Sequence, residues 1–217
     1  SRPGVGKEQP LDSLLYGPQG PYRMGEVRVG SEILGKDGKV YSVTGVYPQG
    51  RKMSYRVTFS DGSSTECGID HLWTVRHRRK DEFVTMTLRQ LLDAGLTDGD
   101  HAKWVLPMAQ PVEFNKRDLP IDPYVLGCLI ADGSLRSQVK FCNSEEDVVA
   151  KFIARLPKSA TVGKVIKGRE YPVRNLYREL DTLGLRGKKS FEKFIPEAYK
   201  YSSITDRIDI LQGLFDC

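Results

Sequence analysis

The sequence predicts two domains of different classes, an all-β domain followed by an α/β domain. From Pro10 to Val75, short segments rich in Val, Tyr and Thr alternate with tight turns, a pattern typical of antiparallel strands. From Tyr124 onward, apolar segments with helical spacing alternate with short strand-like runs. At 217 residues the chain is long enough for two small domains, each with a core of its own.

Hairpins built on Asp-Gly turns dominate the predicted β domain. We expect type I′ turns at Asp37-Gly38 and Asp61-Gly62, because Asp-Gly tolerates the positive φ angles that these turns require. The expected strands cover residues 25–34, 39–47, 54–59 and 64–67. Beyond them we expect a helix over residues 85–95 with Thr87 as its cap and Gly95 as its end, a strand over residues 101–107 and a polar linker over residues 115–122.

An apolar helix over residues 124–135 organises the predicted α/β domain. Gly127 lets another backbone approach this helix closely, and Asp132 lies near its end. A second copy of the pattern begins at Asp209, with Gly213 in the place of Gly127, so the counterpart of Asp132 is the residue after Cys217. We expect the two helices to pack side by side and to bring two carboxylates close enough to hold Mg²⁺. An ordinary core helix with a terminal Asp is the alternative interpretation.

The rest of the predicted α/β domain alternates strands and helices. We expect a strand over residues 138–142, a helix capped at Ser144, a strand pair over residues 161–166 and 171–173, and a short helix that ends at Gly184. The helix after Ser144 is predicted to bury Val148, Val149, Phe152, Ile153 and Leu156.

Composition narrows the class of protein. The net charge of +5 fits a polyanionic partner, although a solvated basic surface explains so modest an excess equally well. The four cysteines form no CxxC pair, which favours reduced thiols and a cytoplasmic protein. No apolar run approaches the roughly 18 residues that a membrane helix needs, so no membrane partner is expected.

The first seven residues resemble part of the phosphate loop of an ATPase. In such a loop glycines such as Gly4 and Gly6 let backbone N–H groups surround phosphates, and a lysine such as Lys7 reaches the β- and γ-phosphates. Glu8 follows where Ser or Thr should hold Mg²⁺, so we do not expect this loop to bind ATP as it stands. Two interpretations remain open, a flexible terminus and a loop interrupted by an insertion.

The predicted β domain resembles the amino-terminal splicing blocks of inteins. The similar segments are Met24-Gly-Glu-Val-Arg-Val-Gly30, Val43-Thr-Gly-Val-Tyr-Pro-Gln-Gly50, Tyr55-Arg-Val-Thr-Phe-Ser-Asp-Gly62 and Glu66-Cys-Gly-Ile-Asp-His-Leu-Trp-Thr-Val75. The resemblance implies the Hint fold, a horseshoe of β-hairpins, and a catalytic role for His71 in cleaving the Lys7–Glu8 bond. A near-neutral imidazole suits this role because it can donate a proton to the departing amide nitrogen.

Two positions depart from the intein pattern. Glu8 stands where most inteins begin with Cys or Ser, and a carboxylate cannot carry out the acyl shift to sulfur or oxygen. Gly68 stands where a Thr often precedes the histidine by three residues. Either the start has been mutated, or this intein belongs to the kind that lacks a first-residue nucleophile and carries a tryptophan where Trp73 stands.

The second domain resembles a LAGLIDADG homing endonuclease of the kind that inteins carry. Val125-Leu-Gly-Cys-Leu-Ile-Ala-Asp-Gly133 is similar to the motif that names the family, and the predicted order of elements matches its αββαββα repeat. The resemblance implies cleavage of double-stranded DNA with Asp132 as a catalytic Mg²⁺ ligand and Lys193, ahead of Phe-Ile-Pro, as a catalytic lysine. A surface salt bridge is the alternative role of Lys193. Members with a single motif work as homodimers, so dimerisation through this helix is one possibility.

Together these resemblances predict an intein inserted in the phosphate loop of a DnaB-type replicative helicase. Residues 1–7 would be host sequence, residues 8–115 the first part of the splicing domain, and residues 116–217 the endonuclease domain, truncated at its second motif. The partners would be DNA, the remaining carboxyl-terminal half of the intein and the flanking host segments. Splicing would need no cofactor, and ATP would serve only the spliced host.

Two other functions compete with this prediction. One is a splicing-inactive or catalytically dead remnant that binds DNA, and the other is a secreted or signalling Hint protein. We expect that residues 1–217 alone neither splice nor cut DNA efficiently.

Overall fold

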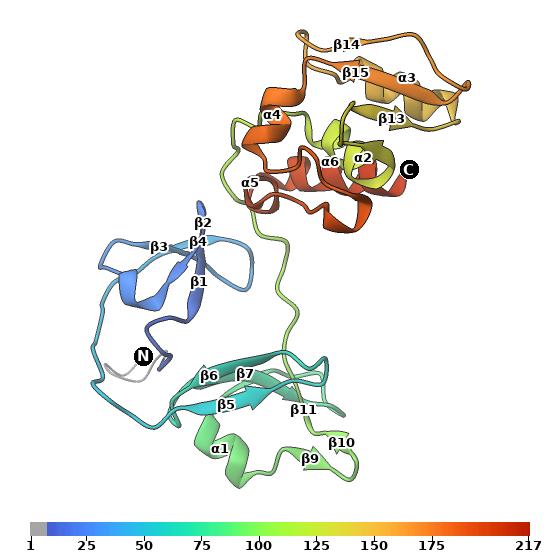
Figure 1. Cartoon of the computed structure of the whole chain (residues 1–217). Helices are drawn as coiled ribbons and strands as arrows, with labels where there is room; N and C mark the ends of the chain where they lie inside the picture. The colour runs from blue at the N-terminus through green and yellow to red at the C-terminus, as the bar shows by residue number, and fades with distance from the viewer. Residues whose placement is uncertain (1–7) are drawn as a thin grey trace. The chain divides into compact units, whose positions relative to one another are not determined.

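The structure is a computed structural model that describes residues 8–217. The chain divides into a first unit that ends at Val112 and a second unit that begins at Glu113 (Figure 1). This division lies three residues before the boundary predicted from the sequence. Each unit is described by itself.

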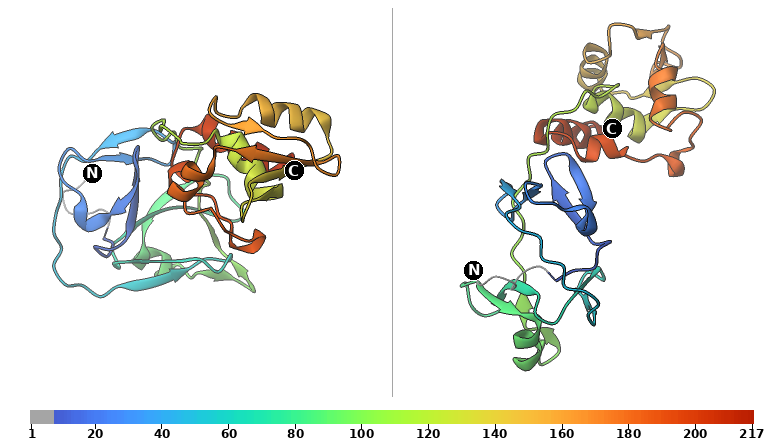
Figure 2. Two further views of the ribbon diagram at one scale, coloured as in Figure 1. Left: turned by 45° about the horizontal axis from the view of Figure 1, so that its top comes forward. Right: turned by 90° about the vertical axis from the view of Figure 1, so that its left-hand side faces the viewer.

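The first unit consists of small antiparallel sheets, seen from two further sides in Figure 2. Three of them are hairpins: β1 (Leu14–Gly17) with β2 (Gly20–Arg23), β3 (Glu32–Leu34) with β4 (Val40–Ser42), and β5 (Tyr55–Thr58) with β6 (Ser64–Cys67). A three-stranded sheet has the order β11 (Trp104–Val105), β7 (Leu72–His77), β8 (Val84–Thr87), and a short pair joins β9 (Thr97–Asp98) to β10 (His101–Ala102).

Both predicted Asp-Gly hairpins are present, but the predicted turn type is wrong. Gly38 and Gly62 have φ of 77° and 84°, whereas their neighbours Asp37 and Asp61 do not have positive φ. The Gly38 N–H donates to Gly35 O at 3.0 Å, and Gly35 N–H donates to Lys39 O at 2.8 Å. This is a type I turn followed by a left-handed glycine, the bulged three-residue hairpin loop. It needs one positive φ where a type I′ turn needs two.

Strand lengths in the first unit differ from the prediction. The expected strand over residues 25–34 holds only β3, because Met24–Glu26 forms a 3-10 turn and Gly30, with φ of 88°, interrupts the extended backbone. The expected strand over residues 101–107 is split into β10 and β11. The hairpin of β1 and β2 was not predicted.

The short helix α1 (Leu88–Asp93) has the predicted cap, but it is shorter than the helix predicted over residues 85–95, because Val84–Thr87 forms β8. Thr87 Oγ1 accepts the N–H of Gln90, and the Gln90 side chain accepts the Thr87 N–H, so both form a capping box. Gly95, two residues past the helix, has φ of 79°.

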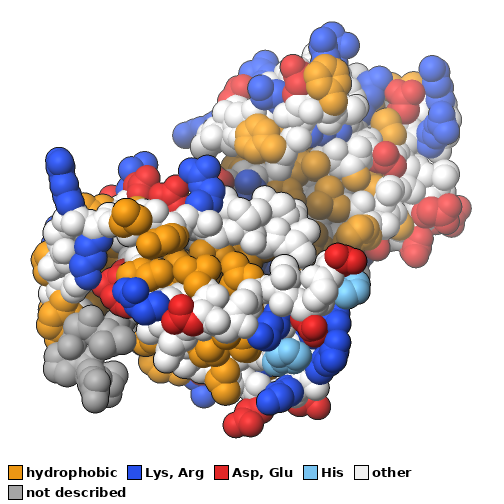
Figure 3. All heavy atoms as spheres, turned by 90° about the horizontal axis from the view of Figure 1, so that it is seen from below, with side chains coloured by type: hydrophobic (Ala, Val, Ile, Leu, Met, Phe, Trp, Pro, Cys, Tyr) orange, Lys and Arg blue, Asp and Glu red, His pale blue; other side chains and the backbone are white. Residues whose placement is uncertain are grey.

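The core of the first unit is small. Its buried hydrophobic side chains include Val27, Cys67, Val75, Leu88 and Leu91, while large side chains such as those of Met53 and Tyr47 are mostly exposed. Hydrophobic side chains are visible between Lys and Arg on the surface in Figure 3. The hairpins therefore rely more on their local hydrogen bonds than on a shared interior.

The second unit contains the predicted order of helices and strands. The elements are α2 (Pro123–Asp132), β12 (Gly133–Ser134), β13 (Lys140–Cys142), α3 (Glu146–Ala154), β14 (Thr161–Val162), β15 (Glu170–Arg174) and α4 (Tyr177–Thr182), followed by a 3-10 turn at Ser190–Glu192, α5 (Glu197–Lys200) and α6 (Ile204–Phe215). The sheet is antiparallel with the order β12, β13, β15, β14. From α2 to α4 the order is therefore α, β, β, α, β, β, α.

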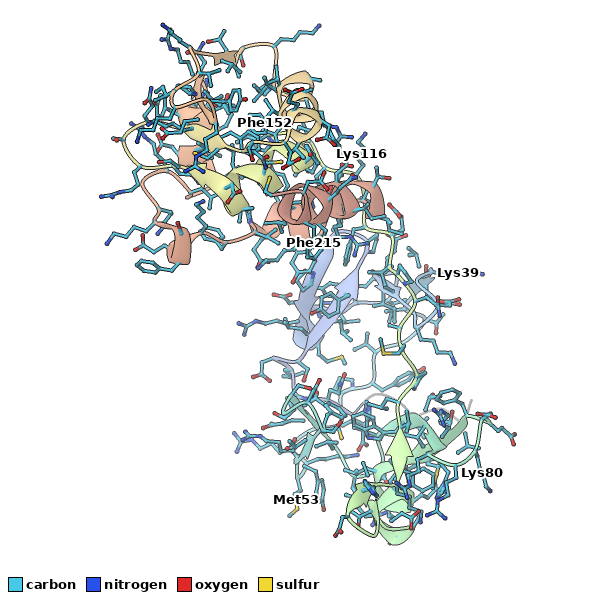
Figure 4. The ribbon with its side chains drawn as sticks, turned by 90° about the vertical axis from the view of Figure 1, so that its right-hand side faces the viewer. Lys39, Met53, Lys80, Lys116, Phe152 and Phe215 are labelled. Atoms are coloured by element: carbon cyan, nitrogen blue, oxygen red, sulfur yellow. The ribbon has the colours of Figure 1, made fainter. Side chains whose placement is uncertain are left out.

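The core of the second unit lies around α2. This helix is buried from Pro123 to Leu129, and the Phe141 ring stacks on Phe152 with centroids 4.1 Å apart. Figure 4 labels Phe152 in this interior and Phe215 at the end of α6. The buried Tyr199 hydroxyl donates to Ile121 O at 2.8 Å and accepts Ile121 N–H at 3.1 Å, which ties α5 to the segment before α2.

Two details of α3 differ from the prediction. The helix is capped at Glu145 instead of Ser144, because Asn143 Oδ1 accepts the Glu145 N–H at 2.8 Å and holds the preceding residues in a turn. Ile153 is 41% exposed, whereas Val149 and Phe152 are buried as expected.

Candidate functional site

The two glycine-containing helices pack backbone against backbone. A Cβ atom added at Gly127 would collide with Ile210 O and lie 3.0 Å from Gly213 Cα, and one added at Gly213 would collide with Tyr124 O. Each colliding carbonyl belongs to the residue three positions before the glycine of its own helix. The contact is thus reciprocal, and the predicted close packing of the two copies is confirmed.

The start of α2 is fixed by charge. Asp122 Oδ1 accepts the N–H groups of Tyr124 and Val125 at 2.9 and 3.2 Å, as an N-cap does. Pro123 occupies the first turn, where its missing N–H costs nothing. The Arg155 guanidinium lies 3.6 Å from Asp122 and 2.9 Å from Asp209, so it links the N-cap of α2 to the middle of α6.

The end of α2 carries Asp132, which is exposed, next to Lys193. Lys193 Nζ donates to the carbonyl oxygens of Leu129, Ile130 and Gly133 at 3.1, 2.9 and 2.6 Å. Leu129 O also accepts the Gly133 N–H, and all three carbonyls lie in the last turn of α2 or at its C-cap, so the ammonium caps the end of the helix. Burial lowers the pKa of Lys193, and the Asp132 carboxylate opposes that shift. The structure thus brings two predicted site residues together, although Lys193 forms a helix cap and not the alternative surface salt bridge.

Three thiols lie around the same helix end. The Cys128 thiol donates to the Cys217 sulfur, which raises the pKa of Cys128 together with burial and lowers the pKa of Cys217. Burial also raises the pKa of Cys142, and Asp132 contributes to that shift. All three cysteines are free.

The donor set around Asp132 does not by itself fit Mg²⁺. Within the part of the chain that the structure describes, no group of three or more His, Cys, Asp and Glu side chains could hold a metal ion. Asp132 supplies one hard oxygen ligand, and its titratable neighbours include two thiols and the Lys193 ammonium. The predicted second carboxylate would come from the residue after Cys217.

A polar cluster between α2 and α6 was not predicted from the sequence. The Tyr124 hydroxyl donates to Asp216 Oδ2 at 2.8 Å, and Lys151 Nζ lies 3.2 Å from the same oxygen and 4.0 Å from the Tyr124 ring centroid. Burial and the bond to Asp216 raise the pKa of Tyr124. Tyr124 stands three residues before Gly127 and Asp216 three after Gly213, which are not matching positions of the two copies, so the sequence carries no signal that pairs them.

In the first unit, Glu8 is held against the strand that leads to His71. The Gly68 N–H donates to Glu8 O at 2.7 Å, and Lys52 Nζ lies 2.6 Å from Glu8 Oε1. The Glu8 side chain is only 10% exposed. Neither Lys52 nor any link between Glu8 and Gly68 was predicted from the sequence.

His71 and Trp73 lie beside this contact. The His71 N–H donates to Gly68 O at 3.2 Å, so Gly68 is hydrogen-bonded to both Glu8 and His71. The imidazole is 6% exposed, and its centroid lies 5.3 Å from that of Trp73 in an edge-to-face arrangement. Burial raises the pKa of Cys67, the nearby Trp73 N–H opposes this shift, and the Glu8 carboxylate adds to it. A protonated, buried thiol is a poor nucleophile.

The phosphate-loop candidates Gly4, Gly6 and Lys7 lie outside the described residues, and with them the carbonyl side of the Lys7–Glu8 bond. Among the helices of residues 8–217, none has the length and apolar character needed to span a membrane.

The chain is similar in sequence to helicases described as DnaB, and a solved intein structure matches part of it. No protein-family model matches the chain. The crystal structure of a substituted variant of the gp41-1 intein is 24% identical and covers 50% of this chain and 83% of its own, with a TM-score of 0.35, too low to establish a shared fold.

Two curated relatives are both described as replicative DNA helicase DnaB. The protein from Mycobacterium leprae (strain TN) is 41% identical over 76 residues, which cover 34% of this chain and 12% of its own. The protein from Mycobacterium intracellulare is 29% identical over 245 residues, which cover 100% of this chain and 38% of its own. This chain is therefore similar, over its whole length, to somewhat more than a third of a mycobacterial DnaB protein.

Proposed function

We propose that this chain is the amino-terminal part of a protein-splicing intein that interrupts the phosphate loop of a DnaB-type replicative helicase. One observation carries the proposal: Glu8, the residue after the phosphate-loop segment, is hydrogen-bonded to Gly68, which is itself hydrogen-bonded to His71. These main-chain bonds connect both Glu8 and His71 to one residue, which supports the proposal that His71 acts on the Glu8 amide. The similarity to DnaB proteins supports the choice of host.

The proposed chemistry assigns separate roles to His71 and Glu8. His71 donates a proton to the amide nitrogen of Glu8 as the Lys7–Glu8 bond breaks, a task that a histidine side chain can perform as a general acid. Glu8 offers no nucleophile, and the Cys67 thiol is fully buried with a raised pKa. We therefore assign the attack to neither residue, and expect an internal cysteine near the carboxyl end of the intein or the first host residue to make it.

The insertion point suits both proteins. Splicing requires Ser, Thr or Cys directly after the intein, and a phosphate loop requires Ser or Thr directly after Lys7. A single residue meets both requirements. The unspliced precursor would lack helicase activity, and splicing would restore ATP binding in the host.

Expression of the complete reading frame, followed by intact-mass analysis, tests this proposal. We expect a ligated product that joins Lys7 to a downstream Ser or Thr, and an excised protein that begins at Glu8. His71→Ala should leave the precursor intact. A frame that yields only full-length precursor, with His71 present or absent, contradicts the proposal and favours a splicing-inactive remnant.

As a second function we propose that residues 113–217 belong to a LAGLIDADG endonuclease for double-stranded DNA. The favouring observation is the reciprocal packing of the helices around Gly127 and Gly213, which places Asp132 at the end of a closely packed helix pair. Lys193 holds that end through three carbonyls and so fixes the position of the Asp132 backbone. The expected Mg²⁺ needs a carboxylate beyond those described, supplied by the next residue of the frame or by a second copy in a homodimer.

Cleavage of plasmid DNA that carries the uninterrupted host gene tests this second function. The complete protein should cut in the presence of Mg²⁺, and Asp132→Asn should abolish cutting without loss of DNA binding. Equal DNA binding by both proteins with no cutting by either points to a binding remnant. Efficient cutting by monomeric residues 1–217 contradicts the need for a further carboxylate.

A further inference from the structure

The two departures from the intein pattern meet in space. Position 8 carries Glu in place of a nucleophile, and position 68 carries Gly in place of Thr. A Cβ atom at position 68 would collide with Glu8 Oε2, lie 2.9 Å from Glu8 Cβ and lie 3.2 Å from Glu8 Cδ. Any side chain at position 68 therefore occupies the space that the Glu8 side chain fills.

The Glu8 side chain cannot easily move out of that space, because both the backbone and the carboxylate of Glu8 are held by other residues. Its backbone oxygen accepts the Gly68 N–H at 2.7 Å, and Oε1 lies 2.6 Å from Lys52 Nζ. Oε2 is buried and accepts no hydrogen bond within residues 8–217. Lys52 lies in the segment between β4 and β5 and is itself 45% exposed, so the ion pair lies on the solvent side of the Glu8 side chain. We call the space between Gly68 and Lys52 that this side chain fills the Glu8 seat.

We infer that Glu8 is the native first residue of the intein and a positioning residue for the Lys7–Glu8 bond, seated by Gly68 and held by Lys52. This inference rests on the proposed splicing function. Glycine at position 68 leaves the space that the Glu8 side chain needs, so the two departures from the intein pattern depend on each other. The seat fixes the residue that carries the scissile nitrogen, which lowers the entropic cost of presenting that nitrogen to His71.

A double-mutant cycle in the 217-residue chain tests the seat without any need for splicing. The variants are Glu8→Ala, Gly68→Thr and the double variant, and the fluorescence of Trp73 and Trp104 reports unfolding of the first unit. We expect Gly68→Thr to lower the unfolding midpoint when Glu8 is present and to lower it less when Ala is at position 8, because Ala removes the Oε2 and Cδ contacts and keeps only the Cβ contact at 2.9 Å. Equal effects in both backgrounds overturn the inference.

Lys52 is tested in the complete reading frame against a matched ion pair. Lys52→Met should slow cleavage at Lys7–Glu8 roughly tenfold or more, and Lys52→Arg should restore most of the rate. Arg56→Met is the control, because the Arg56–Glu66 pair is exposed on the surface with a similar separation of 2.9 Å. Equal rates for Lys52→Met and Arg56→Met overturn the positioning role.

These experiments distinguish the two proposals. A frame that forms no ligated product refutes the splicing function, and the positioning role with it. If the complete protein splices but the effects of Glu8→Ala and Gly68→Thr are independent of each other, the splicing function stands and only the positioning role of Glu8 is refuted.

Discussion

Replacing Gly127 by alanine should destabilise the second unit. In an exposed helix this change stabilises by about 1 kcal/mol, because glycine loses more backbone entropy on folding than alanine. Here the new methyl group meets Ile210 O and the Gly213 backbone, neither of which can rotate away as a side chain would. Overpacking of this kind costs about 1–3 kcal/mol. We expect a net loss of up to about 2 kcal/mol in the free energy of unfolding.

The measurement is denaturant unfolding followed by two signals. Helical circular dichroism reports mainly the second unit, which holds α2, α3 and α6, whereas both tryptophans, Trp73 and Trp104, lie in the first unit. Gly127→Ala should move the dichroism transition to lower denaturant and leave the fluorescence transition in place.

Gly163→Ala is the matched control, since a Cβ there meets only Pro172 and Arg174 side-chain atoms at 3.5–3.8 Å. It should be neutral or stabilising. Gly213→Ala should resemble Gly127→Ala, and the double variant should lose less than the two effects added, because both methyl groups separate the same pair of helices. A dichroism midpoint that rises equally in Gly127→Ala and Gly163→Ala would falsify the close-packing argument.

Three further predictions follow from the caps and the buried hydroxyl. Asp122→Ala should lower the free energy of unfolding by about 1 kcal/mol in the dichroism transition, and Thr87→Ala should lower it by about as much in the fluorescence transition. If Asp122→Ala moved the fluorescence transition and Thr87→Ala the dichroism transition, the assignment of the caps would be wrong. Lys193→Met should lower the free energy of unfolding, measured by dichroism, by about 1–3 kcal/mol, and Lys193→Arg should recover part of it. An unchanged free energy would contradict the role of Lys193 as a helix cap. The pKa of Tyr124 is raised above its ordinary value of 10.0, first by burial. The folded state therefore retains this proton longer than the unfolded state, so stability is complete below that value and falls as pH rises past it, and Tyr124→Phe should weaken this alkaline loss.

Periodic patterns in the sequence were sufficient to predict the helix pair. Gly127 and Gly213 each interrupt an apolar run at the same place, and a glycine within such a helix suggests a backbone contact. Thr87 and Gly95 likewise mark the ends of α1 correctly, because capping chemistry is local. The Asp-Gly turns were placed correctly but typed wrongly, since the same dipeptide serves loops of two and of three residues.

Contacts between residues far apart in the chain could not be predicted from the sequence. Lys193 caps a helix through Gly133 O, 60 positions away, and Lys52 pairs with Glu8 across 44 positions. No spacing rule connects such residues. In the sequence, Gly68 in place of Thr is a second departure from the intein pattern, unrelated to Glu8. The structure shows that side chains at positions 8 and 68 would compete for the same space.

The contact between α2 and α6 also bears on how fast the two copies can diverge. Over Tyr124–Ala131 and Ile210–Cys217, glycine is the one residue that the aligned copies share. The contact is made by main-chain atoms at the two glycines, so it places little demand on the identity of the flanking side chains. Two helices that pack in this way can therefore differ at nearly every other position and still keep their register, so low sequence similarity between two helices does not exclude a close contact between their backbones.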